Sequence, residues 1–130
     1  MRGFAERYTA AWCGRDPNAV AAFFAPDGAL AINDGAPARG RDAIAGVAND
    51  FMIAFPDLEV RMDDLVEHDG KVIYRWTLIG TNSGPGGSGD HVQISGSEEW
   101  SIDADGLIEA SRGRFDAAEY QRQVEGGVQR

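Results

Sequence analysis

Cysteine, histidine and long apolar runs are scarce in this chain, which has one cysteine and two histidines in 130 residues. A single cysteine, Cys13, excludes an intramolecular disulfide. A nucleophilic thiol needs a nearby base, and no histidine lies in this segment, so we interpret Cys13 as a small buried apolar residue. No stretch approaches the ~18 apolar residues of a membrane span. The N-terminal segment lacks an apolar run followed by a cleavage site, which predicts no secretion signal. We therefore expect a cytoplasmic protein with no membrane contact.

Positive charge is also in short supply. The chain has 12 Lys and Arg residues against 21 Asp and Glu residues, a formal net charge of −9. Nucleic acids and anionic membrane surfaces require a basic face, so we expect neither as a partner. The sequence has no His/Cys/carboxylate spacing typical of a metal site and no glycine-rich strand-to-helix motif for a nucleotide. It also has no serine in a nucleophile motif. It therefore predicts no metal and no cofactor.

What the chain does have is clear periodicity, enough for one domain with a core. We expect that domain to span residues 1–125, with a flexible tail over 126–130. Apolar spacing predicts helices over 2–13, from Pro17 with Asp16 as its cap, over 41–54 and over 116–124. Alternation and turn signals predict strands over 29–34, 58–67, 71–81, 92–103 and 107–115. Helices followed by an antiparallel meander predict an α+β fold, in which helices cross the concave side of a curved sheet and enclose one pocket.

Two carboxylates fall on apolar faces of predicted strands. In the strand over 92–103, Glu98 shares a face with Trp100, whereas its neighbour Glu99 points to water, because side chains alternate along a strand. Asp34 is likewise in phase with the apolar residues of the first strand. Burial disfavours a charged carboxylate, and two nearby acids disfavour double ionisation. Such a pair tends to separate into one base and one acid that keeps its proton, which suits proton transfer.

Each of these residues also has a purely structural interpretation. Asp34 stands at a strand end and can turn to solvent. Arg75 or Arg112 can pair with Glu98 and make it structural. Tyr8, on the buried face of the first helix, is either a core residue or a hydrogen-bond donor in the pocket. The residues expected to contact a small apolar ligand are Trp12, Phe51, Phe55, Trp76, Trp100 and Arg112.

Several segments together resemble a known group. The stretches "ERYTAAWCGRD", "FFAPDGAL", "GRDAI", "AFPDLEV", "RWTLIGTNSG" and "DGLIE" are similar to the SnoaL-like, ketosteroid-isomerase-like branch of the nuclear transport factor 2-like superfamily. The resemblance extends to about Val124. It implies a cystatin-like fold, with a cone-shaped, mostly antiparallel sheet and three to four helices, and a homodimer formed through the sheet. Members include Δ5-3-ketosteroid isomerases, polyketide cyclases and limonene-epoxide hydrolases.

Residues 6–36 resemble ketosteroid isomerase without a gap. The resemblance places that enzyme's tyrosine on Tyr8, its base on Asp34 and its protonated acid on Glu98, which is a glutamate here instead of an aspartate. It implies that Asp34 removes a proton while Tyr8 and neutral Glu98 hold the enolate oxygen. We thus expect a cofactor-independent isomerase- or cyclase-like enzyme acting next to a carbonyl of a small steroid- or polyketide-like substrate. The alternatives are a non-catalytic ligand-binding domain and epoxide-hydrolase-like water activation, against which Gly113 counts, because related hydrolases carry an acid there.

Overall fold

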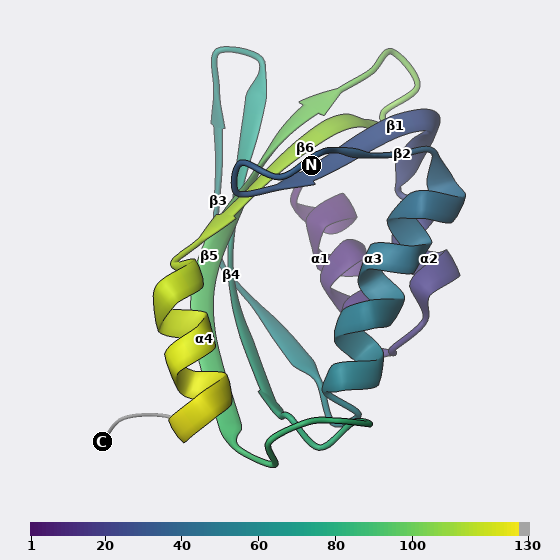
Figure 1. Ribbon diagram of the computed structural model, residues 1–130. Helices are drawn as coiled ribbons and strands as arrows, with labels where there is room; N and C mark the ends of the chain where they lie inside the picture. Colours follow the sequence, from purple (N-terminus) through teal and green to yellow (C-terminus); the bar gives the residue numbers. More distant parts are fainter. Residues whose placement is uncertain (128–130) are drawn as a thin grey trace.

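A computed structural model describes residues 1–127 as a curved sheet with three helices across one face and a fourth at its side (Figure 1). The helices are α1 (Arg2–Cys13), α2 (Pro17–Ala21), α3 (Arg41–Ala54) and α4 (Ala117–Gly126). The strands are β1 (Phe24–Ile32), β2 (Ala38–Arg39), β3 (Glu59–His68), β4 (Lys71–Thr81), β5 (His91–Ile102) and β6 (Ile108–Phe115). Their order in the sheet is β2-β1-β6-β5-β4-β3.

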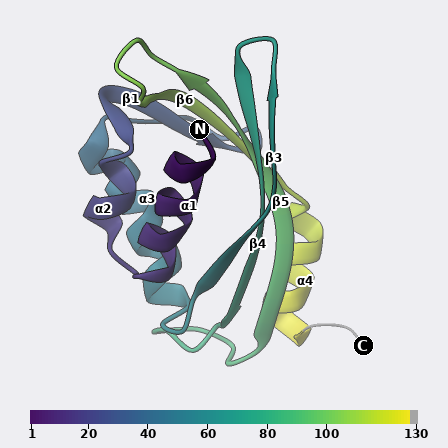
Figure 2. The same ribbon diagram turned by 180° about the vertical axis from the view of Figure 1, so that it is seen from behind.

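The sheet is antiparallel except where β1 runs parallel to β6. Seen from behind, α1, α2 and α3 lie together against its concave side, and α4 lies beside β5 (Figure 2). β6 pairs with β5 only from Gly96 onward. Beyond that point α4 follows the open edge of β5, where the backbone N–H of Gln93 donates to the side chain of Gln123 at 2.7 Å. This arrangement leaves a space between the sheet, α3 and α4.

Local sequence signals explain the helix boundaries. The Asp16 side chain accepts a hydrogen bond from the Ala19 N–H at 3.1 Å, and Pro17 occupies the first turn of α2. Asp116 caps α4 in the same way, through the N–H of Glu119. Such caps satisfy N–H groups that have no partner within the helix. They fix where α2 and α4 begin, and therefore how these helices meet the sheet.

The α+β fold with a curved, mostly antiparallel sheet is confirmed, and most predicted elements agree within one or two residues. Three details differ. β2 lies between residues 34 and 41, where the sequence pattern predicts no strand. It has only two residues, Ala38 and Arg39, which pair with β1. β1 begins at Phe24, before the predicted start at residue 29, and its pairing with β6 is irregular between Phe24 and Ala29. Gly126 is the last residue of α4 and not part of a tail; residues 128–130 of that predicted tail lie outside the described residues.

Within residues 1–127, no helix is long and apolar enough to cross a membrane. Cys13 is half-buried, and its Sγ lies 3.1 Å from the carbonyl oxygen of Val60, to which the thiol donates. The sulfur therefore joins α1 to β3, which agrees with a structural role. The cytoplasmic location and the homodimer through the sheet stay predictions.

Candidate functional site

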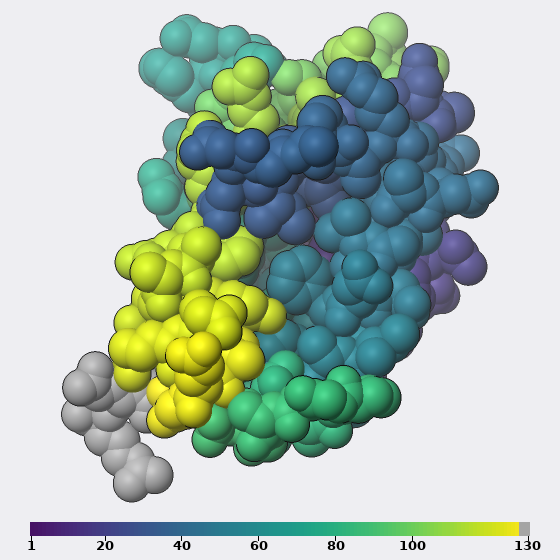
Figure 3. Space-filling view, viewed as in Figure 1, coloured from purple at the N-terminus to yellow at the C-terminus, as the bar shows by residue number. Residues whose placement is uncertain are grey.

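A pocket opens between the concave face of the sheet, α1, α3 and α4. Figure 3 shows the hollow on the surface, between the segment around β1 and β2, α3 and α4. Aromatic side chains make up much of its wall, namely Trp12, Phe51, Tyr74, Trp76, Phe115 and Tyr120. The aliphatic part of the wall is made by Leu30, Ile32, Val47, Val60, Leu78 and Ile94. Among the residues that line it, Glu98 is the only one with a carboxyl group.

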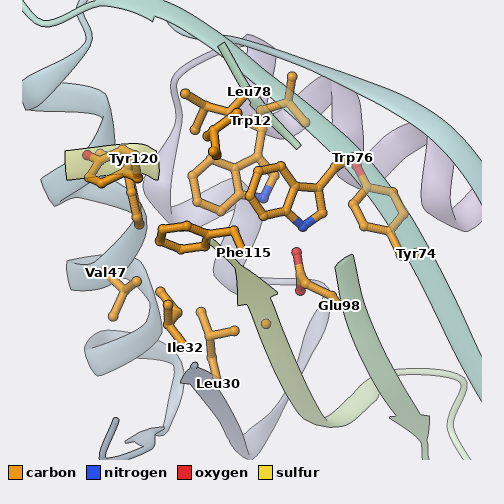
Figure 4. Close-up of a pocket in the computed structure, with 14 residues that line it drawn as sticks. Trp12, Leu30, Ile32, Val47, Tyr74, Trp76, Leu78, Glu98, Phe115 and Tyr120 are labelled. Carbon is orange, nitrogen blue, oxygen red and sulfur yellow. The ribbon is translucent and has the colours of Figure 1, made fainter. Parts of the chain in front are cut away.

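Glu98 lies on the floor of this pocket because of its place in the sheet. It is on β5, directly between Tyr74 of β4 and Gly113 of β6. Only 8% of the residue is exposed, whereas the next residue, Glu99, faces solvent on the opposite side. The alternation of side chains along β5 therefore predicts the orientation of both acids correctly. In Figure 4 the carboxyl group of Glu98 points into the space bounded by Trp12, Trp76 and Phe115.

Three neutral donors hold the Glu98 carboxyl group. The Tyr8 hydroxyl lies 3.0 Å from Oε1 and 3.1 Å from Oε2. The indole Nε1 of Trp100 donates to Oε1 at 3.0 Å, and the Ser111 hydroxyl donates to Oε1 at 2.7 Å. Oε1 thus has three donors, while within residues 1–127 Oε2 has only the Tyr8 hydroxyl. Oε2 is the oxygen with capacity left for a ligand.

Within the described residues, no positive charge compensates this carboxyl group. Across the described chain, no Lys, Arg or His nitrogen lies within 4.0 Å of Glu98. The two arginines considered as partners, Arg75 and Arg112, are exposed and make no ion pair with it. Burial therefore raises the pKa of Glu98 above its ordinary value of 4.5, although the hydrogen bonds from Trp100, Ser111 and Tyr8 lower it in part. The site favours a carboxyl group that keeps its proton to higher pH than an ordinary glutamate.

The donors are themselves fixed by aromatic packing. Tyr8 and Trp100 are fully buried, with ring centroids 5.2 Å apart in an edge-to-face arrangement. Tyr74 stacks on Trp100 at 4.9 Å and 17°. Burial, followed by the nearby charge of Glu98, raises the pKa of Tyr8 well above 10, so its hydroxyl keeps its proton and donates. The cluster positions Glu98 before any ligand arrives.

The expectation that Asp34 faces the pocket is wrong. Its side chain is 96% exposed, and its nearest basic partner is Arg114 at 3.8 Å. β1 ends at Ile32, and Asn33 adopts a left-handed conformation with φ 53°, so the alternation of the strand does not continue to residue 34. The Asn33 backbone N–H donates to the carbonyl of Gly113 at 2.7 Å, which holds the turn in place. Asp34 and Glu98 therefore do not form a pair.

The predicted ligand contacts divide into two groups. Trp12, Phe51 and Trp76 line the pocket, as expected. Phe55 and Trp100 are fully buried and do not line the pocket. Phe55 packs against Tyr120 of α4, and Trp100 packs against Tyr8 of α1 and Tyr74 of β4. Arg112 points away from the pocket. It lies opposite Glu99 in the register of β5 and β6, on the face of the sheet turned to solvent. The positions of Phe55, Trp100 and Arg112 as ligand contacts are therefore corrected.

Sequence patterns do not identify Ser111 and Tyr74 as neighbours of Glu98, and they give Gly113 only as the position where related hydrolases carry an acid. Ser111 lies opposite Trp100 on β6, which brings its hydroxyl to Glu98. Alternation along β6 places Ser111, Gly113 and Phe115 on one face, but only the pairing register with β5 puts them beside Glu98. A Cβ on Gly113 would lie 4.0 Å from Cγ of Glu98, in ordinary van der Waals contact, so there is room for a methyl group next to the acid. Within residues 1–127 no three His, Cys, Asp or Glu side chains converge as metal ligands, and no arginine lies between two acids in the pocket.

A comparison with known protein families identifies the family of this domain. The SnoaL-like domain family matches residues 5–110. The chain belongs to the SnoaL-like domain family. A search of curated protein sequences found no match.

Solved structures agree with this family. A putative SnoaL-like polyketide cyclase from Jannaschia sp. CCS1 is 17% identical, with a TM-score of 0.84 over 98% of this chain and 92% of that one. A hypothetical protein with a ketosteroid isomerase-like fold from Catenulispora acidiphila DSM 44928, in complex with trimethylamine, is 19% identical, with a TM-score of 0.81 over 93% and 91% of the chains. AclR, a putative hydroxylase from Streptomyces galilaeus, is 18% identical, with a TM-score of 0.80 over 99% and 84%. At these identities the similarity establishes the fold, and the named activities belong to those proteins.

Proposed function

We propose that this SnoaL-like domain binds a small, largely apolar carbonyl compound and moves a proton at the carbon next to its carbonyl group, with Glu98 as the acid–base group. One observation carries the proposal: a buried carboxyl group with no cationic partner among residues 1–127 lies on the floor of an apolar pocket, with Oε2 available to a ligand. Perturbed carboxyl groups in concave apolar sites are typical of proton-transfer catalysts. This replaces the two-acid scheme that the resemblance implied.

A single glutamate is sufficient for such a reaction. Ionised Glu98 accepts the proton from the carbon next to the carbonyl group and leaves an enolate. The neutral acid then returns the proton to the same carbon or to a conjugated one, which exchanges or isomerises the substrate. The donors on Oε1 hold the group in one orientation throughout. Because its pKa is raised, the carboxylate is a stronger base than an exposed glutamate would be.

The size of the pocket favours small ring compounds. The cavity volume open to the centre of a water molecule is about 70 Å³. One water molecule needs roughly 10–15 Å³ of such space. The pocket thus corresponds to about five to seven waters, or roughly 150–200 Å³ of liquid. A ligand of one or two rings fits this space, whereas a four-ring steroid would extend through the mouth. The name of one solved relative, a putative polyketide cyclase, agrees with a carbonyl-containing substrate.

Solvent-deuterium exchange tests the proposal without knowledge of the natural substrate. One- and two-ring ketones are incubated with the protein in D₂O, and deuterium uptake next to the carbonyl group is followed by mass spectrometry. We expect uptake above the buffer rate with the wild-type protein and about a 10²–10⁴-fold loss of this excess rate in Glu98→Gln. Glu99→Gln, one residue away on the solvent face, is the matched control and retains the full rate. Equal rates in all three proteins would refute an acid–base role for Glu98.

A second candidate, a ligand-binding domain without catalysis, is favoured by a different observation. Among the described residues, Glu98 alone brings a carboxyl group to the pocket, and its Oε1 is fully occupied by internal donors. In this case the protein binds ketones with no deuterium uptake above the buffer rate. Calorimetric titration with the same compounds, performed beside the exchange assay, separates the two functions.

A further inference from the structure

The indole nitrogen of Trp76 is a buried donor without a partner. Its Nε1 is shielded from solvent, and it makes no hydrogen bond with any group of residues 1–127. Among the buried side-chain nitrogen and oxygen atoms of the described residues, it is the only one left in this state. An unpaired buried N–H is unfavourable, and native proteins rarely keep one without a reason. A bound acceptor would supply that reason.

The fold holds this indole firmly in position. Trp76 on β4 lies opposite Gly96 of β5, and the absence of a side chain there makes room for the ring. A Cβ on Gly96 would come within 2.5 Å of Cζ2 of Trp76. Phe115 packs against the ring edge-to-face, with centroids 6.1 Å apart. The direction of the Nε1–H group is therefore set by the sheet and does not depend on a ligand.

The unpaired donor and Glu98 face the same space. Both residues line the pocket, and Figure 4 shows the indole nitrogen of Trp76 directed toward the region in front of the Glu98 carboxyl group. The Tyr8 hydroxyl and the Trp100 indole are already bound to Glu98, whereas the Trp12 indole also lines the pocket. Among the described donors around the acid, the Trp76 Nε1–H group is the buried one without a partner, and it is available to a ligand.

We propose that the Trp76 Nε1–H group donates a hydrogen bond to the carbonyl oxygen of the ligand and so places the neighbouring carbon beside Oε2 of Glu98. The inference rests on the proposed function and adds its recognition element. Trp76 takes the place at the enolate oxygen that the sequence resemblance gave to Tyr8. The ligand class is an apolar one- or two-ring compound with a single acceptor oxygen, whose rings contact the aromatic wall. A hydrocarbon of the same shape lacks the acceptor and leaves Trp76 unpaired.

Nuclear magnetic resonance of the wild-type protein tests this contact directly. The chain has three tryptophans, so a ¹H–¹⁵N spectrum contains three indole signals, which single Trp→Phe variants assign. The probes are 1-indanone and indane, which share a two-ring skeleton and differ in the keto oxygen. We expect the Trp76 indole proton to shift downfield with 1-indanone and not with indane. The Trp100 signal, already bound to Glu98, is the internal control and stays in place with both.

Affinity gives a second, independent measurement. We expect Trp76→Phe to weaken binding of 1-indanone by roughly three- to tenfold, the value of one hydrogen bond, and to leave indane binding within twofold. An unmoved Trp76 signal while 1-indanone occupies the pocket overturns the inference, as does an equal loss of affinity for both probes. If the same sample still shows ketone-dependent deuterium exchange, the proposed acid–base function of Glu98 stands and only the role of Trp76 is rejected. If neither probe binds, the proposed binding of small apolar ring compounds in the pocket is wrong, and the inference about Trp76 is wrong with it.

Discussion

The Tyr8 hydroxyl reaches across from α1 to both oxygens of Glu98, at 3.0 Å and 3.1 Å, and joins the first helix to the centre of the sheet. Burial raises the pKa of both Tyr8 and Glu98, so each side chain favours its protonated form. The contact therefore combines a hydroxyl that always donates with a carboxyl group that ionises late. It also makes α1 a part of the site, although Tyr8 itself does not line the pocket.

Removing that hydroxyl changes the acid. In Tyr8→Phe, the ionised form of Glu98 loses one of its donors, so we expect the Glu98 pKa to rise further. We also expect the free energy of unfolding to fall by about 1 kcal/mol, because a buried hydrogen bond is lost. Carbon-detected titration of the carboxyl group and urea unfolding measure the two effects. Tyr120→Phe, on α4 at the pocket mouth, is the control and changes neither by a comparable amount; a lower Glu98 pKa in Tyr8→Phe contradicts the assignment.

The stability of the protein depends on pH through Glu98 with a defined sign. The folded-state pKa is raised, so the folded protein binds this proton more tightly than the unfolded chain, whose value is about 4.5. The contribution is therefore present below about pH 4.5 and is lost as pH rises toward the folded-state pKa. We expect the wild type to lose stability relative to Glu98→Gln across this window. Urea unfolding of both proteins from pH 4 upward measures this. A difference in the free energy of unfolding that stays constant with pH would contradict the prediction.

Asp34 has no part in the chemistry proposed here. Its side chain is almost fully exposed, so we expect Asp34→Asn to leave deuterium exchange unchanged and to alter the free energy of unfolding by less than about 0.5 kcal/mol. The exchange assay with the same ketones provides the measurement. A loss of rate comparable to that of Glu98→Gln would restore the two-acid scheme and contradict the single-glutamate mechanism.

The two glycines beside the pocket respond differently to a methyl group. A Cβ at Gly96 comes within 2.5 Å of Trp76, whereas the nearest atom to a Cβ at Gly113 is the carbonyl oxygen of Ala31, at 3.4 Å. We expect Gly96→Ala to destabilise the protein by roughly 1–3 kcal/mol through overpacking. We expect Gly113→Ala to fold with a smaller change and to bind two-ring ketones more weakly, because the methyl group occupies space beside Glu98. Thermal unfolding and calorimetry compare the variants; equal destabilisation by both would contradict the described packing.

Local sequence patterns predict the parts of the site that depend on one element. The two-residue period of β5 orients Glu98 inward and Glu99 outward, and the helical period of α1 places Tyr8 on the buried face. The same reasoning fails for Asp34, because the strand ends two residues earlier and Asn33 turns the chain. It also cannot find Ser111, whose contact with Glu98 depends on the register between β5 and β6. Pairing register and the exact end of a strand depend on the whole sheet and not on the local sequence.

Glu98 differs from an ordinary glutamate because burial, with no cationic partner among residues 1–127, raises its pKa. A pH titration of its side-chain carboxyl carbon by ¹³C nuclear magnetic resonance, assigned through the Glu98→Gln variant, measures this directly. We expect a titration midpoint for Glu98 clearly above the ordinary value of 4.5. A midpoint at or below 4.5 for Glu98 would contradict it.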